Sequence, residues 1–333
     1  MNPDGLTVVV VGCGSIGQRH LRNLAAIPEV TRLSAVDPDG LRRQEAAAAG
    51  ATPFATLEEA LAHGPDAVVV ATPTYLHLEG LREALAHGCH ALVEKPIAMS
   101  CNGVAPLLEQ ADRTKRLVMM GNNLRFHPAV QELWRLMRAG EIGQIVWARA
   151  EYGWYLPNWR PTRDHRETYS ARRDQGGGVL LDVCHEIDLM HYLLGKPATV
   201  LCITRNTGVL GTDVDEVAAL ICSFEGGVMV ELHLDCIQRS YCRTCKVVGT
   251  EGTAIWDYPG GKLAVFRAQT GSWEERNWEG FTPEHAYQVE MQQFIAAARS
   301  GARADPNGWD GLRTLRLVEA AARSALTGCR ESI

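Results

Sequence analysis

The N-terminal third of the chain alternates apolar runs with amphipathic stretches. The first run begins at Leu6, is rich in β-branched valine and is typical of a buried parallel strand. It ends in a cluster of glycines, after which residues 15–26 show the periodicity of a helix. Strand and helix patterns then follow in turn as far as about residue 121. Repeated units of this kind predict a doubly wound parallel sheet, a Rossmann domain, over residues 1–122.

Each further element of this region is bounded by glycine, proline or a polar turn. Strands are expected at 31–37, 67–71, 90–94 and 117–121, and helices at 41–49, 57–63, 75–87 and 102–113. Ligands of such a sheet bind at the carboxyl ends of its strands. Residues directly after residue 94 are therefore expected beside the bound ligand.

Beyond residue 122 the pattern changes to consecutive strands. A helix over 128–139, a long strand from 144, an irregular polar and aromatic loop over 153–175 and one helix over 179–194 precede them. Six strands joined by glycine-rich hairpin turns predict a mostly antiparallel sheet. Residues 123–333 are thus expected to form an α+β domain for substrate binding and oligomerisation.

Two helices, over 284–298 and 309–326, end this second part of the chain and can pack back on the first domain. One face of the strand-rich domain needs a cover, which predicts a homo-oligomer, a dimer or a tetramer.

The glycines after the first strand form a GxGxxG motif between a strand and a helix, the context that a dinucleotide site requires. Gly12 permits the tight turn, Gly14 lets a pyrophosphate approach the backbone, and Gly17 lets the helix pack closely on the strand. The helix N-terminus at Ser15 and Ile16 offers free N–H groups and a positive dipole end to the phosphates.

Asp37 ends the second predicted strand, where a carboxylate would hold the ribose hydroxyls. A carboxylate there repels a 2′-phosphate, which favours NAD over NADP. Arg42 and Arg43 lie near enough to bind that phosphate if Asp37 turned away, so NADP stays the alternative.

Composition narrows the function classes. The chain has 333 residues, 46% of them hydrophobic, with a formal net charge of −6, which provides no basic footprint for nucleic acid. Neither a membrane-spanning run nor a signal peptide is evident, so a cytoplasmic protein is expected. Most of the ten cysteines lie in apolar runs as small hydrophobes, and the one CxxC, Cys242 and Cys245, lacks a second pair. Reduced thiols and no metal are therefore expected.

Several motifs, in order along nearly the whole chain, resemble those of the Gfo/Idh/MocA oxidoreductases. Beyond the glycine motif they are Thr72-Pro73 with His77, Glu94-Lys95-Pro96, and Gly176-Gly177-Gly178 followed by Asp182, His185 and Asp188. The resemblance implies an NAD(P)-dependent oxidation or reduction at one carbon of a small sugar, cyclitol or sugar derivative.

The resemblance also implies roles for three residues. Lys95 would lie beside the reacting hydroxyl or carbonyl, with Asp182 and His185 opposite it. These roles agree with the chemistry, because His185 can accept a proton at neutral pH and an ammonium stabilises developing negative charge on oxygen. On the helix predicted over 179–194, Asp182 lies one turn before His185 and about 60° round the axis, so both can face one cleft.

One departure from the family pattern concerns that pair. Many members separate the Asp and the His by four residues, but Asp182 and His185 are three apart, so one of the two is expected to point differently from the family pattern. His185 and Asp188 keep the usual HxxD spacing, and Asp188 is expected to cap or buttress the helix.

The remaining site predictions fall into two groups. Cofactor contacts are expected from Gly12, Gly14, Ser15, Ile16, Gly17, Asp37, Thr72, Pro73, His77, Glu94 and Lys95, although His77 could equally begin a helix face. Substrate contacts are expected from Arg125, Tyr152, Trp159, Tyr169 and Arg172, for which a surface lid or a dimer contact is the alternative.

Two other functions stay open at this point. A relative could use NAD only transiently, for a glycosidase- or epimerase-like net reaction. A non-catalytic regulator could sense a sugar or a dinucleotide, although the presence of both Lys95 and His185 argues against it.

Overall fold

The computed structural model describes residues 5–333, which divide into two compact units. The first unit comprises residues up to 123 together with 283–312, and the second comprises 124–282 together with 313–333. No helix within residues 5–333 combines the length and the apolar character needed to cross a membrane.

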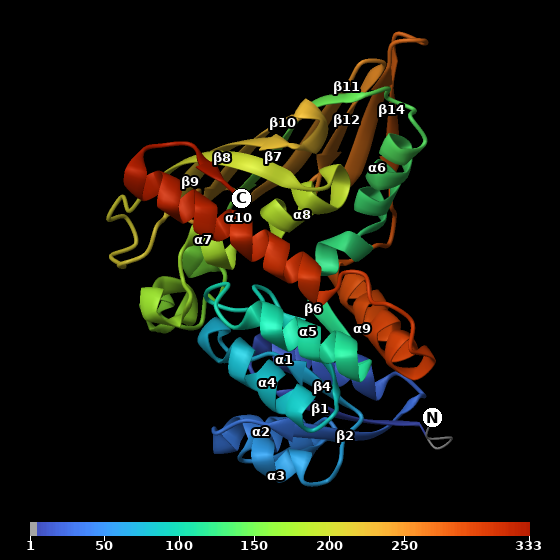
Figure 1. The fold of residues 1–333 in the computed structure, drawn as a ribbon, viewed down its shortest axis with the longest axis vertical. Coiled ribbons are helices and arrows are strands. Elements are labelled where there is room, and N and C mark those ends of the chain that lie inside the picture. Colours follow the sequence, from blue (N-terminus) through green and yellow to red (C-terminus); the bar gives the residue numbers. More distant parts are fainter. Residues whose placement is uncertain (1–4) are drawn as a thin grey trace. The chain divides into compact units, whose positions relative to one another are not determined.

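The first unit is built on a six-stranded parallel sheet with the order β3-β2-β1-β4-β5-β6, the doubly wound order. Figure 1 labels β1, β2, β4 and β6 of this sheet. Its strands are β1 Leu6–Val11, β2 Val30–Val36, β3 Thr52–Phe54, β4 Ala67–Val70, β5 His90–Glu94 and β6 Val118–Gly121. Strands β1, β4 and β5 are almost wholly buried, as their continuous runs of valine, alanine and leucine require.

Helices cover this sheet. They are α1 Ser15–Ala25, α2 Gly40–Ala48, α3 Leu57–Leu61, α4 His77–Ala86, α5 Val104–Thr114 and α9 Pro283–Ser300, with the first residues of α10 Gly308–Thr327. Helix α1 packs on β1 and β2, and α9 packs on α1 although more than 250 residues of chain separate them.

The second unit contains a nine-stranded sheet with the order β14-β13-β12-β11-β7-β10-β9-β8-β15. Only the β7–β10 pair is parallel, and every other neighbouring pair is antiparallel. The strands are β7 Ile145–Gly153, β8 Pro197–Arg205, β9 Val217–Phe224, β10 Met229–Asp235, β11 Cys242–Gly249, β12 Gly252–Asp257, β13 Lys262–Arg267, β14 Ser272–Asn277 and β15 Glu331–Ser332.

Helices pack against the sheet of the second unit. They are α6 Pro128–Arg138, α7 Val179–Asp182, α8 His185–Leu194 and α10 from residue 313. Helix α6 contacts β12 and β13, and α8 contacts β7 and β10. Helix α10 is tied to β8 because the hydroxyl of Ser324 accepts the N–H of Cys202 at 2.9 Å. The architecture, a Rossmann domain followed by a mostly antiparallel α+β domain, confirms the predicted fold class.

The structure corrects the element predictions at several points. Strands β3, β14 and β15 were not predicted, because they are short or carry few apolar residues. The predicted helix over 75–87 begins as a 3-10 turn, Thr74–Leu76, and becomes α-helical at His77. The loop over 153–175 contains four short 3-10 turns, at Leu156–Asn158, His165–Glu167, Tyr169–Ala171 and Arg173–Gln175.

The single helix predicted over 179–194 is wrong, because it is two helices. Helix α7 ends at Asp182, and α8 begins at His185. Val183 has φ −100° and ψ 33°, which interrupts the regular helical path. Contrary to the prediction from the sequence, Asp182 and His185 therefore do not lie one turn apart on one helix.

All ten cysteines lie within the described residues and are free thiols. Cys242 and Cys245 are three positions apart on β11, so their side chains leave opposite faces of the strand. They cannot converge on a single ion while that strand is intact.

Candidate active site

The three motif glycines meet three different physical demands. Gly12 has φ +90°, and a Cβ there would lie 2.6 Å from the carbonyl oxygen of Ala71. A Cβ on Gly17 would collide with the carbonyl oxygen of Gly12. Gly14 has an ordinary φ of −69°, and a Cβ built on it meets no atom within 4 Å. The backbone of Gly14 is therefore open to a ligand, as a pyrophosphate site needs.

The N-terminus of α1 begins at this open position. No side chain caps it, and no acidic residue lies in its first turn. An uncapped N-terminus directs backbone N–H groups and a positive dipole end toward an anion. The loop and the helix together fit a dinucleotide phosphate.

Asp37 follows β2 and is buried. One carboxylate oxygen accepts the N–H of Cys13 in the glycine turn at 2.8 Å, and the other accepts the N–H of Asp39 at 2.9 Å. Asp37 thus places its carboxyl group directly beside the glycine turn. Arg42 approaches this carboxylate to 3.5 Å, and Arg43 donates to the carbonyl oxygens of Asp37 and Pro38. Both arginines are engaged with the Asp37 segment, which agrees with the NAD preference.

The turns after β4 and β5 are joined by His77, the first residue of α4. One ring nitrogen lies 2.6 Å from the carbonyl oxygen of Pro96 and the other lies 2.8 Å from that of Thr72. Burial lowers the pKa of His77 against the opposing effect of these two carbonyls. The buried side chain of His77 therefore joins the turn after β4 to the turn after β5, which carries Lys95. Its predicted contact with the cofactor stays a prediction.

Glu94, the last residue of β5, anchors the segment that carries Lys95. His20 of α1 lies 2.7 Å from one carboxylate oxygen, and the N–H of Lys95 donates to the other at 3.3 Å. Burial opposes ionisation of Glu94, but the hydrogen bond and charge of His20, with the charges of Lys95 and His77, lower its pKa overall. Lys95 is half-buried and is joined to Pro96 by a cis peptide bond.

In the second unit the glycine triplet lets the chain pack closely at the start of α7. A Cβ on Gly177 would lie 2.5 Å from the carbonyl oxygen of Ser170, and Gly178 has φ +101°. A Cβ on Gly178 would lie 2.5 Å from the carboxylate of Asp215, which accepts the N–H of Leu180 at 3.0 Å. The sequence does not reveal this role of Asp215, because no pattern near residue 215 indicates that its side chain caps a distant helix.

Asp182 and His185 flank the break between α7 and α8. Asp182 is buried, and the phenol of Tyr169 donates to it at 3.3 Å. His185 is half-buried at the first position of α8. Trp159 and Asp182 line the same small cavity of about 10 Å³, together with Leu156, Ser170, Gly178, Val179, Val183 and Cys236. That volume holds about one water molecule.

The predicted substrate residues separate into two groups. Tyr152 and Trp159 contact each other edge to face with ring centroids 6.0 Å apart, so they lie near Tyr169 and Asp182. The side chains of Arg125 and Arg172 are instead engaged in ion pairs. Arg172 is exposed and pairs with Asp174 at 3.0 Å.

Arg125 forms a buried bidentate ion pair with Asp188. Its Nε and one Nη lie 2.9 and 2.6 Å from the two carboxylate oxygens. Asp188 therefore buttresses α8 from the segment before α6. The substrate contact predicted for Arg125 stays a prediction.

A largely buried ion pair lies against the ring of Tyr152 and was not predicted. Arg243 of β11 lies 2.7 Å from a carboxylate oxygen of Glu186, and its guanidinium lies 4.7 Å from the centre of the Tyr152 ring. Burial disfavours the charge of Arg243, but Glu186 and the surrounding phenols raise its pKa overall. Only the fold brings residues 186 and 243 together, so no local pattern could have indicated the pair.

Comparisons with known proteins agree with this geometry. Residues 6–122 match the family model described as an oxidoreductase family with an NAD-binding Rossmann fold, and residues 130–255 match the GFO/IDH/MocA C-terminal domain. An inositol 2-dehydrogenase of Burkholderia vietnamiensis is 27% identical over 98% of this chain and 96% of its own. A 1,5-anhydro-D-fructose reductase of Ensifer adhaerens is 28% identical over 79% of this chain and 78% of its own.

Solved structures share the fold. A levoglucosan dehydrogenase in complex with NADH superimposes with a TM-score of 0.91 at 21% identity, and 99% of each chain is covered. GenD2 from gentamicin A biosynthesis, in complex with NAD, superimposes with a TM-score of 0.86 at 26% identity over 99% of this chain and 97% of its own. The family match confirms the predicted resemblance, the enzyme class and the NAD cofactor. The chain belongs to the GFO/IDH/MocA family of oxidoreductases, and its first unit carries the NAD-binding Rossmann domain of that family.

Proposed function

We propose that this protein is an NAD-dependent dehydrogenase or reductase that acts on one carbinol or keto carbon of a sugar, cyclitol or sugar derivative. Relatives named for inositol and 1,5-anhydro-D-fructose match most of the chain, which supports that substrate class. The observation that carries the proposal is the fixed end of β5. There Glu94 holds the N–H of Lys95, and His77 holds the carbonyl of Pro96.

The proposed chemistry divides between cofactor and protein. Bound NAD supplies the hydride acceptor at the carboxyl ends of the strands. The ammonium of Lys95 stabilises negative charge on the reacting oxygen, which lowers the pKa of a substrate hydroxyl. We assign the hydroxyl proton to His185, which returns it in the reducing direction. Asp182 is proposed to orient the imidazole or to hold a neighbouring substrate hydroxyl.

Replacing Lys95 by methionine tests the proposal, because it removes the charge and keeps most of the side-chain volume. We expect kcat to fall about 10²–10⁴-fold, as for the loss of a group that acts on the reacting oxygen or its proton. Binding of NADH, measured by fluorescence, should weaken far less than kcat falls, since the glycine turn is untouched. Initial rates are measured with inositols, 1,5-anhydro sugars and levoglucosan.

Lys115→Met is the matched control, because Lys115 is exposed at the end of α5 in the same unit. It should leave kcat unchanged. A Lys95→Met enzyme with undiminished kcat on an active substrate would contradict the assignment of Lys95. Substrate turnover without net NADH formation would instead indicate a reaction that uses NAD transiently.

We also propose that a second copy of the chain covers the open face of the nine-stranded sheet. This face carries exposed apolar residues on β8, β9 and β10, namely Leu201, Ile203, Ile221 and Met229. Their neighbours in sequence, such as Val200, Cys202 and Leu220, point to the opposite face and are buried. Arg149 and Glu231 lie opposite each other in the same sheet, so a two-fold copy can match their charges.

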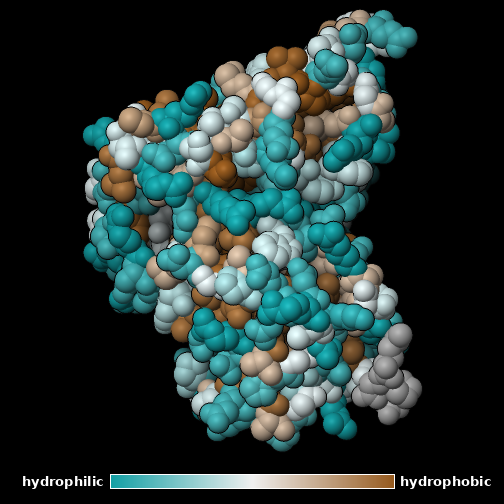
Figure 2. Space-filling view, in the orientation of Figure 1, coloured by the Kyte–Doolittle hydropathy of each residue, from teal (hydrophilic) through white to brown (hydrophobic). Residues whose placement is uncertain are grey.

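Figure 2 shows one side of the protein, where apolar side chains gather along the upper edge, over the strands of this sheet. The ten free cysteines fit a reducing compartment, so we propose that the enzyme works in the cytoplasm.

A further inference from the structure

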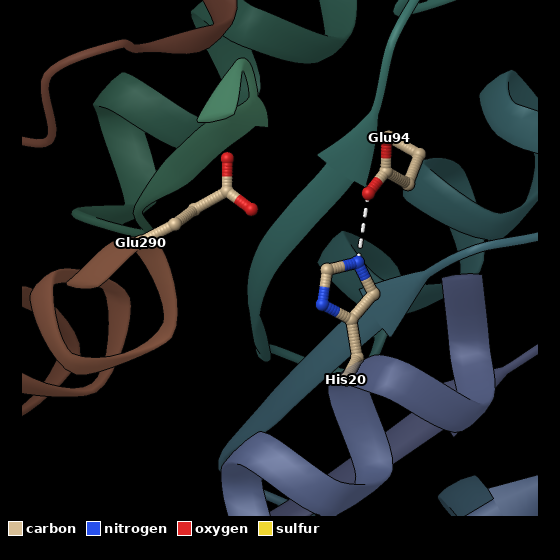
Figure 3. Close-up of side chains that lie close together, drawn as sticks. All are labelled: His20, Glu94 and Glu290. Atoms are coloured by element: carbon tan, nitrogen blue, oxygen red, sulfur yellow. Dashed lines mark hydrogen bonds and ion pairs between the residues drawn. The ribbon is translucent and has the colours of Figure 1, made fainter. Parts of the chain in front are cut away.

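A buried polar cluster lies at the end of β5 in the first unit, formed by residues from three distant segments (Figure 3). His20 comes from α1, Glu94 ends β5, and Glu290 comes from α9. One ligand-type atom of each lies within 4.8 Å of the others. Glu94 bonds to His20 at 2.7 Å, and the carboxyl group of Glu290 points toward that pair.

Glu290 is the unusual member of this cluster. Its side chain has 0% exposure, and neither carboxyl oxygen has a hydrogen-bond partner among the described residues. An isolated carboxylate in such a place would lose its hydration without compensation, which a neutral carboxylic acid avoids. Glu94 next to it adds like-charge repulsion. Geometry therefore favours a proton on Glu290.

Glu94 is equipped to carry the charge instead. It accepts from His20 and from the N–H of Lys95, and Gly121 of β6 makes room for it. A Cβ on Gly121 would lie 2.9–3.0 Å from the Glu94 carboxyl atoms. The strand end that holds Lys95 is thus shaped around one charged carboxylate.

Other charged and titratable groups near Glu290 lie on α1, on α4, directly after β5 and on α9 itself. Lys95 and His77 lie near Glu94, and Tyr287 lies one turn before Glu290 on α9. Arg19 covers the Tyr287 ring at 4.4 Å and pairs with Glu284 at 2.9 Å. Burial first, and then the charge of Glu94, raises the pKa of Glu290 well above its usual range.

We propose that Glu290 holds a proton in this cluster, so that His20, Glu94 and Glu290 together carry one carboxylate charge and keep Lys95 in place. Glu290 is then a positioning residue that acts through Glu94. The inference that Lys95 benefits rests on the proposed function, whereas the proton on Glu290 does not. Ionisation of Glu290 would put two negative charges in the cluster and loosen the end of β5.

The pH dependence of stability tests the proton directly. A carboxyl whose pKa is raised on folding binds its proton more tightly in the folded chain, so its contribution is complete at low pH. The contribution is lost as pH rises from about 4.5 through the pKa that Glu290 has in the folded chain. Over this range the folding constant falls by up to about tenfold per pH unit. Glu290→Gln keeps the shape of the neutral acid and cannot ionise. Relative to the wild type, it should become steadily more stable as pH rises.

Glu284→Gln is the matched control on the same helix, because Glu284 is partly exposed and pairs with Arg19. Its stability curve should run parallel to that of the wild type. Parallel curves for Glu290→Gln and the wild type would overturn the proposal. If Glu290→Gln does not fold, infrared spectra of the wild type decide, because a protonated carboxyl must be visible at neutral pH.

Two further measurements separate the alternatives. A metal centre made of the same three residues predicts a bound divalent ion whose removal by chelator destabilises the wild type, and that result would overturn the proposal. In turnover, kcat of the wild type should fall toward alkaline pH more steeply than kcat of Glu290→Gln, while KM changes alike in both. Parallel stability curves refute the proton on Glu290, whereas an undiminished kcat of Lys95→Met contradicts only the role that the proposed function gives to Lys95.

Discussion

At the scale of single residues, the glycine turn shows how one residue type serves three purposes. Gly12 is needed for its positive φ, Gly17 for close packing, and Gly14 for neither. The sequence motif predicted these roles, and the surroundings of each Cα agree with them. Gly14 is therefore the position where ligand binding and folding can be separated by mutation.

Gly14→Ala and Gly17→Ala should consequently fail in different ways. The methyl group of Gly14→Ala meets no protein atom within 4 Å, so the melting temperature should stay within about 2 °C, because surface changes of this kind cost little. NAD affinity should fall at least about tenfold, since the methyl occupies the approach of the pyrophosphate.

Gly17→Ala places its methyl against the carbonyl oxygen of Gly12 and should lower the melting temperature clearly. Calorimetry and NADH fluorescence titration measure both variants. The interpretation fails if Gly14→Ala binds NAD as the wild type does.

At the scale of elements, the break between α7 and α8 changes the meaning of a sequence spacing. The three-residue separation of Asp182 and His185 departs from the four-residue spacing of many family members, and the structure places the two residues on different helices. Asp215 caps the first helix, and Arg125 holds the second through Asp188. Each helix is thus positioned by its own distant partner.

Removing the charge of Asp188 should destabilise the second unit. Asp188→Asn leaves Arg125 buried with no carboxylate in its bidentate pair, and the loss of one partner in such a pair costs about 3–5 kcal/mol. Urea denaturation followed by circular dichroism measures the change. Glu275→Gln removes one partner of an exposed pair with Lys262 and should cost no more than about 1 kcal/mol. Equal effects of the two substitutions would contradict the structural role of Asp188.

At the scale of the whole chain, the C-terminal segment is shared between the units. Helix α9 belongs to the Rossmann unit, where Glu284 bonds to Arg19 and Asn23 and where Glu290 reaches the end of β5. Most of α10 belongs to the other unit. The N-terminal domain is therefore incomplete without residues that follow the second domain in sequence.

The open sheet face provides a test at this scale. A charge at Ile203, whose side chain is 71% exposed, should not disturb the fold but should weaken association of copies through the face. We expect Ile203→Lys to move the molar mass measured by light scattering toward the single chain of 36.5 kDa.

Leu326→Lys is the control, because Leu326 is more exposed still but lies near the end of α10. A wild type that already has the mass of one chain would refute the proposed covering of the face.

The sequence by itself determined the Rossmann topology, the dinucleotide turn, the acid after β2 and the position of Lys95 after β5. These features are local, because a strand, a glycine turn and a helix follow one another within about thirty residues. The backbone conformation and packing that each of them requires involve residues that are close in sequence. Most strands of the second domain are equally predictable, from the alternation of apolar and polar residues and from hairpin turns.

Only the tertiary structure decided which distant residues support these elements. Three single polar residues have no sequence pattern around them that predicts their partners. They are Asp215, which bonds to α7, Arg243, which pairs with Glu186, and Glu290, which lies beside Glu94. Their roles follow from burial, since a polar group removed from water must find a partner or a proton wherever the fold supplies one.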